Sequence, residues 1–123
     1  MKKVLVVEDN EKNMYLICFI LERMGHRAIR AGTGEDGVAL ALREQPDLIL
    51  MDIQLPGIDG QEATRQIRQS AAGRAVPIVA ITSFAMAGDR ERLLSSGCTG
   101  YIEKPINPET IMGDIAGFLE EKT

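Results

Sequence analysis

The sequence predicts an α/β fold, in which one parallel sheet of five strands carries five helices on its two faces. Short apolar runs alternate along the chain with longer helical segments, the pattern of repeated β-α-β units. The segment 47–52 is almost continuously apolar, as expected of a strand buried on both faces. A length of 123 residues is enough for one domain with a single core.

The predicted strands are short, mostly rich in Val, Ile and Leu, and bounded by Gly, Pro, Asn or Asp residues that end regular structure. Because parallel strands need long crossover connections, each strand is expected to be followed by a helix. The strands are expected at residues 3–8, 27–31, 47–51, 78–81 and 100–102.

The first three helices are located by their capping residues. Asn10 is expected to cap the N-terminus of the first helix. Gly25 is expected to end it, because glycine readily adopts the left-handed backbone found at helix C-termini. Thr33 or Gly34 opens the second helix, and Asp59 caps the third.

The last two helices differ in composition. The fourth, after Phe84, is rich in charge and offers Leu93 and Leu94 as its core anchors. The fifth begins at Asn107-Pro108, because proline suits the first helical position. Its apolar residues follow helical spacing and are Ile111, Met112, Ile115, Phe118 and Leu119.

The composition excludes several classes of protein. Apolar residues make up 45% of the chain and charged residues 26%, which is typical of a folded globular domain. A net charge of -4 argues against a nucleic-acid-binding surface, which needs a basic stripe. No apolar run approaches the ~20 residues of a membrane span, and no cleavable signal segment begins the chain. Cys18 and Cys98 suggest no disulfide framework, so the cytoplasm is the expected compartment.

Polar side chains follow four of the predicted strands at the point where each strand ends. Glu8 and Asp9 follow the first strand, Asp52 the third, Thr82 the fourth and Lys104 the fifth. The carboxyl ends of parallel strands meet at one edge of a sheet, where α/β proteins bind their ligands. Three acids, a hydroxyl and a lysine at this edge predict a site for a metal ion and a phosphoryl group.

Carboxylates gathered so closely predict a bound cation. Two carboxylates ~4 Å apart repel each other by about 4 kcal/mol at an effective dielectric constant of about 20. A divalent ion removes this repulsion, and ligands that are all oxygen favour Mg²⁺, with Mn²⁺ as the alternative.

In this order and spacing, the motifs resemble those of response-regulator receiver domains, the CheY-like phospho-acceptor modules of two-component signalling. The motifs that carry the resemblance are Glu8-Asp9, Asp52 with the subsequent Leu-Pro-x-x-Asp-Gly, Thr82, and Lys104-Pro105. Within the family, residues 10–14 and 82–86 are most similar to stand-alone single-domain regulators of the DivK type.

The resemblance covers essentially the whole chain and implies a flavodoxin/CheY-like sheet with the strand order 2-1-3-4-5. It also implies a single receiver domain over residues 1–123 with no output domain. A receiver domain excised from a hybrid histidine kinase is the alternative, because such domains share the same motifs.

The resemblance also assigns a role to each residue of the acidic site. Asp52 is the expected phosphoryl acceptor. Mg²⁺ is expected on Asp9, Asp52 and the backbone carbonyl of Gln54, with Glu8 acting largely through a bound water. The protein is therefore expected to assist its own phosphorylation and dephosphorylation without being an enzyme.

Further residues are expected to hold the phosphoryl group and to respond to it. Lys104 is expected to hold one phosphoryl oxygen, and the Thr82 hydroxyl with the Ser83 backbone N–H another. Lys104-Pro105 is an expected cis peptide. Phosphorylation is expected to draw Thr82 inward and to let the Tyr101 ring turn in behind it. This pair would reshape the face formed by the fourth helix, the fifth strand and the fifth helix.

The partners implied by the resemblance are proteins. A sensor histidine kinase, a histidine phosphotransfer protein or both would donate the phosphoryl group, and a downstream protein target would read it. Nucleic acid and membrane are not expected partners. The expected oligomeric state is a monomer or a weak, phosphorylation-dependent dimer.

The first helix carries more apolar residues than one face can bury, since residues 14–21 are all apolar. Tyr15, Cys18 and Phe19 are expected on or near its outer face, where they would form a docking patch for a phosphodonor protein. The ordinary alternative is a few scattered exposed apolar side chains.

Gln54 and Phe84 each lie two residues beyond a site residue, namely Asp52 and Thr82. Phe84 is expected to shield the acyl phosphate from water, whereas Gln54 can orient an attacking water. With Phe84 excluding water from the acyl phosphate, we expect a fairly long-lived phosphorylated state.

Two other classes of function are disfavoured by visible residues. A phosphatase of the haloacid dehalogenase type also uses a Mg²⁺-assisted aspartyl nucleophile, but Asp52-Ile53-Gln54 lacks the second acid of its Asp-x-Asp motif. A flavodoxin-like cofactor binder needs a phosphate loop after the first strand, where Glu8 and Asp9 would repel a phosphate.

Overall fold

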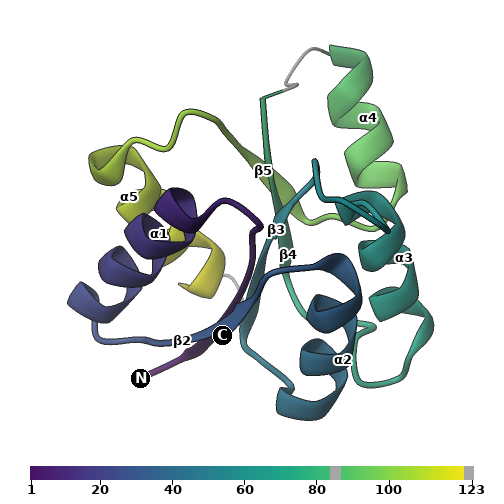
Figure 1. Ribbon diagram of the computed structural model, residues 1–123, viewed down its shortest axis with the longest axis horizontal. Coiled ribbons are helices and arrows are strands. Elements are labelled where there is room, and N and C mark those ends of the chain that lie inside the picture. Colours follow the sequence, from purple (N-terminus) through teal and green to yellow (C-terminus); the bar gives the residue numbers. More distant parts are fainter. Residues whose placement is uncertain (84–86, 121–123) are drawn as a thin grey trace.

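The computed structural model describes residues 1–83 and 87–120, and these form a parallel five-stranded sheet between two layers of helices (Figure 1). The elements in chain order are β1 (Lys3–Val7), α1 (Glu11–Arg23), β2 (Arg27–Ala31), α2 (Gly34–Glu44), β3 (Leu48–Asp52), α3 (Gly60–Gln69), β4 (Ile78–Thr82), α4 (Ala87–Ser95), β5 (Gly100–Glu103) and α5 (Pro108–Glu120). The strand order is β2-β1-β3-β4-β5. The predicted fold class and strand order are confirmed.

Two apolar layers hold the helices on the sheet. Helices α1 and α5 cover one face, and α2, α3 and α4 cover the other (Figure 1). Successive strand residues point to opposite faces, so Val4 and Val6 join the first layer while Leu5 and Val7 join the second. All residues of β3 and β4 are buried, because helices on both faces hide the central strands of a parallel sheet.

The strand ends that bear on the site differ from the predicted ones by a single residue. Strand β1 ends at Val7 and not at Glu8, whereas β3, β4 and β5 continue to Asp52, Thr82 and Glu103. The backbone ladder explains the extension, since Asp52 pairs with Ile81 and Thr82 pairs with Glu103. Where each strand stops is decided by its pairing with a neighbouring strand, and the local sequence pattern does not show that pairing.

The predicted N-caps are confirmed, and the predicted C-cap of α1 is off by one residue. The side chains of Asn10, Thr33 and Asp59 each accept a hydrogen bond from the backbone N–H three residues later. Met24 is the C-cap of α1, and Gly25 follows it with a φ of 85° in the left-handed region. Helix α5 begins at Pro108, as expected.

One of the two core anchors expected on α4 is wrong. Leu94 is 54% exposed, and only its neighbour Leu93 is buried. Met112 is likewise 42% exposed, while Ile111 beside it is buried. Consecutive helical residues are about 100° apart around the axis, so adjacent apolar residues cannot both face the sheet.

Neither cysteine is in a disulfide, since Cys18 and Cys98 are both free and buried. Within residues 1–83 and 87–120, the helices are too short or too polar to cross a membrane.

Helix α3 begins against the end of β3 at a distance that only glycine permits. The Gly60 backbone N–H donates to the Ile53 carbonyl at 3.1 Å. A Cβ at Gly60 would overlap the carbonyl oxygen of Asp52 and lie 2.7 Å from the Cα of Ile53. Gly60 therefore sets how closely α3 approaches the strand end that carries Asp52.

Replacing Gly60 by Ala is expected to lower the free energy of unfolding by about 1–3 kcal/mol, because backbone atoms must move to admit the methyl group. Chemical denaturation measures this change. Gly113→Ala in α5 is the matched control, since a Cβ there meets nothing within 4 Å. The control is expected to gain up to about 1 kcal/mol from helix propensity. Equal stability of Gly60→Ala and the wild type would contradict the close approach.

Candidate phosphoryl and metal site

Three acidic side chains meet at the carboxyl edge of the sheet. Glu8 and Asp9 directly follow β1, and Asp52 is the last residue of β3. One carboxylate oxygen from each lies within 4.8 Å of those of the other two. Glu8 and Asp52 are 2% and 1% exposed, whereas Asp9 is open to solvent. The structure thus brings together the three acids that the sequence places at strand ends.

Lys104 reaches these acids from the end of β5. Its Nζ lies 3.1 Å from Asp52 Oδ1 and 3.9 Å from Glu8 Oε1. The Lys104-Pro105 peptide is cis, as predicted. In the part of the chain that the structure describes, both ion pairs to the acids come from this one ammonium group. The cluster of three carboxylates therefore keeps a net negative charge.

Backbone amides hold one oxygen of each buried acid. The Asn10 N–H donates to Glu8 Oε2 at 3.1 Å, and the Gln54 N–H donates to Asp52 Oδ1 at the same distance. The remaining oxygens, Glu8 Oε1 and Asp52 Oδ2, are buried and have no hydrogen-bond partner among the described residues. Buried acceptors without a donor are costly. These two oxygens are consequently available to a cation or to a reacting group.

The donor set fits a hard divalent cation. Three carboxylates supply only oxygen ligands, and two of them present buried oxygens that no donor in residues 1–83 or 87–120 satisfies. Such a set suits Mg²⁺, and Mn²⁺ binds similar ligands. The role of the Gln54 carbonyl stays a prediction, although its residue lies directly beyond β3 with its N–H on Asp52.

Burial raises the pKa of Glu8 from 4.5 to about 7, and the neighbouring Asp52 adds to the increase. The Asn10 amide and the Lys104 ammonium lower the pKa of Glu8, but by less than burial raises it. The raised pKa is a direct consequence of placing a second carboxylate beside Asp52 away from water.

This raised pKa predicts that the metal-free protein loses stability as the pH rises. Folded Glu8 holds its proton more tightly than the unfolded chain does, so its stabilising effect is complete below pH 4.5 and is lost as the pH passes about 7. Thermal unfolding in EDTA across this pH range measures the loss. Glu8→Gln, which keeps the shape of the side chain but does not titrate, is expected to flatten the curve. An unchanged slope in the variant would assign the pH dependence to other groups.

Thr82 ends β4 at the same edge of the sheet. It is 1% exposed and follows Ile81, the strand partner of Asp52. Its carbonyl accepts a hydrogen bond from the Lys104 N–H at 2.8 Å, which ties the two strand ends together. Ser83 is exposed just beyond it. Tyr101 lies on β5 opposite Ala80 and is half-buried.

One of the three residues expected on the outer face of α1 is buried, and the docking role of this patch stays a prediction. Tyr15 and Phe19 are 67% and 48% exposed, and their rings stack 6.3 Å apart. Cys18, in contrast, is fully buried with its Sγ 3.6 Å from Met14 Sδ. The reason is that α1 packs against α5 as well as the sheet, which buries a wider arc of the helix than one apolar face.

Two residues, Gln54 and Phe84, are expected to control the access of water to Asp52. Gln54 is exposed, two residues beyond Asp52. Phe84, the expected shield, lies outside the described residues.

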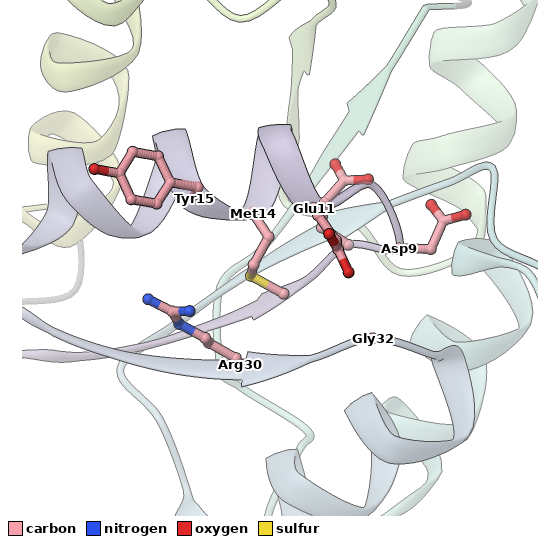
Figure 2. Close-up of a pocket in the computed structure, with 7 residues that line it drawn as sticks. Asp9, Glu11, Met14, Tyr15, Arg30 and Gly32 are labelled. Carbon is pink, nitrogen blue, oxygen red and sulfur yellow. The ribbon is translucent and has the colours of Figure 1, made fainter.

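A cavity of about 580 Å³ opens beside the acids, between α1 and β2. Figure 2 shows Asp9 and Glu11 toward one end of this cavity, and Tyr15 with Arg30 toward the other. The sequence gives no sign of this cavity, because its walls come from segments that only the pairing of β1 with β2 brings together. Its acidic end is lined by Glu8 and Asp9, so the cavity adjoins two of the three acids.

Comparison with known proteins defines the class of protein to which this site belongs. The sequence pattern of the response regulator receiver domain matches residues 4–116. The chain belongs to the response regulator receiver domain family.

Its similarity to particular family members is also high. The polar-differentiation response regulator DivK of Brucella ovis is 43% identical over 118 residues, which is 96% of this chain and 96% of DivK. DivK of Brucella anthropi has the same identity and coverage. The predicted resemblance to DivK-type regulators is confirmed.

Solved structures show the same architecture. The receiver domain of the sensor histidine kinase PA1611 from Pseudomonas aeruginosa is 38% identical with a TM-score of 0.89, over 97% of this chain and 98% of that domain. That structure has a magnesium ion coordinated in the active-site cleft. The chemotaxis response regulator CheY4 of Vibrio cholerae is 26% identical with a TM-score of 0.92, over 96% of this chain and 98% of CheY4.

Proposed function

We propose that this receiver accepts a phosphoryl group on Asp52 from a phosphohistidine of another protein. The observation that carries the proposal is the buried Asp52 carboxylate. Its Oδ2 has no partner among the described residues, while its Oδ1 is held by the Gln54 N–H and by Lys104. An oriented carboxylate with one oxygen available, beside a cation, is what an acceptor of a phosphoryl group requires.

In the transfer, an oxygen of Asp52 forms a bond to phosphorus while the phosphorus–nitrogen bond of the donor histidine breaks. The electron pair of that bond stays on the imidazole, and Asp52 becomes an acyl phosphate. Lys104, already 3.1 Å from Asp52, holds one phosphoryl oxygen, and the Thr82 hydroxyl with the Ser83 N–H holds another. Such transfers are accelerated mainly by positioning and by charge neutralisation.

The metal ion belongs to the same proposal. Held by Glu8, Asp9, Asp52 and the Gln54 carbonyl, Mg²⁺ supplies positive charge that offsets the crowded carboxylates and the incoming phosphoryl oxygens. The two buried oxygens without partners and the all-oxygen donor set support this assignment.

The proposed output is a change of protein surface and not turnover of a substrate. Phosphorylation draws Thr82 inward and favours an inward Tyr101, which alters the face formed by α4, β5 and α5 for a downstream protein.

The phosphodonor is a sensor histidine kinase or a histidine phosphotransfer protein. The transfer takes place in the cytoplasm, where free buried thiols are stable. The relatives of this chain include the response regulator DivK and the receiver domain of the sensor histidine kinase PA1611, which correspond to the two alternatives of a stand-alone regulator and a receiver within a kinase.

The test is the formation of a covalent adduct. The protein is incubated with acetyl phosphate and Mg²⁺, and its intact mass is measured, followed by peptide mapping. One phosphoryl group on the peptide that contains Asp52, lost when EDTA replaces Mg²⁺, is expected. A phosphorylated histidine phosphotransfer protein is the second donor to be tried. An adduct at another residue, or none with either donor, would overturn the proposal.

A further inference from the structure

Two consecutive residues near the start of α4 reach both members of the proposed switch. Asp89 and Thr82 both line a cavity of about 40 Å³. Arg90, the next residue, places its guanidinium carbon 5.1 Å from the centre of the Tyr101 ring. Helix α4 therefore lies against the ends of both β4 and β5, where the switch residues are.

The contact between Arg90 and Tyr101 favours one position of the ring. Tyr101 is half-buried and packs partly against the apolar cluster that contains Leu93 of α4. A guanidinium over a tyrosine ring at this distance is attracted by the negative face of the ring. The attraction stabilises the half-buried position relative to any position in which the ring leaves Arg90.

We propose that Arg90 is a positioning residue for the phosphoryl switch, because it holds Tyr101 half-buried and thereby opposes phosphorylation of Asp52. The inference rests on the proposed function, in which phosphorylation favours an inward Tyr101. Coupling between the two sites is reciprocal, so a contact that resists the inward ring also weakens binding of the phosphoryl group. For a partly exposed cation–π contact, the expected effect on that binding is about two- to fivefold.

The chain has two tyrosines and no tryptophan, so the signal of Tyr101 has to be distinguished from that of one other tyrosine alone. The full chain is labelled with 3-fluorotyrosine, and the two ¹⁹F resonances are assigned with Tyr15→Phe. Beryllium fluoride, a mimic of the phosphoryl group, is then titrated in the presence of Mg²⁺. Rates of phosphorylation by acetyl phosphate are measured in parallel by intact mass.

Arg90→Met removes the guanidinium and keeps an unbranched apolar stem. Before beryllium fluoride is added, the Tyr101 resonance of this variant is expected to lie closer than that of the wild type to the resonance of the beryllium-fluoride-bound protein. The half-saturating concentration of beryllium fluoride is expected to fall about two- to fivefold. Arg90→Lys, which keeps the cation, is expected to restore the wild-type values. Arg43→Met in α2 removes the same charge from a residue paired with Glu44, and is expected to match the wild type.

The outcomes separate the inference from the proposed function. If the wild type responds and Arg90→Met has an unchanged or higher half-saturating concentration, the role of Arg90 is overturned while the phospho-acceptor stands. If the adduct forms but the Tyr101 resonance of the wild type does not move, the link through Tyr101 is overturned. If no adduct forms with either donor, the proposed function fails and the inference fails with it.

Discussion

An Asp52→Asn variant is expected to form no phosphoryl adduct under conditions in which the wild type is fully modified. The amide lacks the anionic oxygen that must attack phosphorus, and no other group in the site replaces it at the same place. We expect the rate of adduct formation to fall by more than about a thousandfold. Intact mass after incubation with acetyl phosphate and Mg²⁺ measures it.

The same variant is expected to remain folded. Asparagine keeps the size of the side chain and can still accept the Gln54 N–H. Removing the charge also relieves the repulsion that raises the pKa of Glu8, so thermal stability in EDTA is expected to hold or increase. Asp114→Asn, at an exposed acid of α5, is the control and is expected to retain the adduct. An Asp52→Asn protein modified as fully as the wild type would place the acceptor elsewhere.

Replacing Lys104 by Met is expected to slow phosphorylation of Asp52 by about a hundred- to a thousandfold while the acceptor stays in place. The Lys104 ammonium lies 3.1 Å from Asp52 Oδ1 and is 18% exposed, so its charge acts with little screening by water. Without it, a phosphoryl oxygen approaching Asp52 loses one of the two cations that are proposed to offset its charge, and only the metal ion remains. Initial rates at saturating Mg²⁺ and fixed acetyl phosphate measure the effect.

The Lys104 variant has a second expected signature. Lys104 lowers the pKa of Glu8, so its loss is expected to raise that pKa further and to shift the pH-dependent loss of stability to higher pH. Lys104→Arg keeps the charge but spreads it over a planar group, and an intermediate rate is expected. Arg43→Met again controls for net charge. A Lys104→Met protein that is phosphorylated at the wild-type rate would remove Lys104 from the mechanism.

The sequence by itself determined the order of the elements, their caps and the residues that reach the site. Asn10, Thr33 and Asp59 cap helices as expected, because capping depends on residues three positions apart. Asp52 and Thr82 end adjacent strands as expected, because parallel strands deliver their carboxyl ends to one edge. Each of these features follows from local periodicity or from a general rule of parallel sheets.

Only the tertiary structure decided which side chains are buried and what they meet. Cys18 is buried because α5 packs beside α1, and Glu8 has a pKa near 7 because the fold places it against Asp52 away from water. Arg68 of α3 resembles a surface arginine in sequence. In the structure its guanidinium donates to the Gly73 and Gly97 carbonyls, both at 2.9 Å.

The contact of Arg90 with Tyr101 is of the same kind, since α4 and β5 meet only in the folded chain. Burial, pKa and side-chain partners depend on distances between elements that only the folded chain brings together. Those distances are set by the packing of every element at once, and no local pattern contains them.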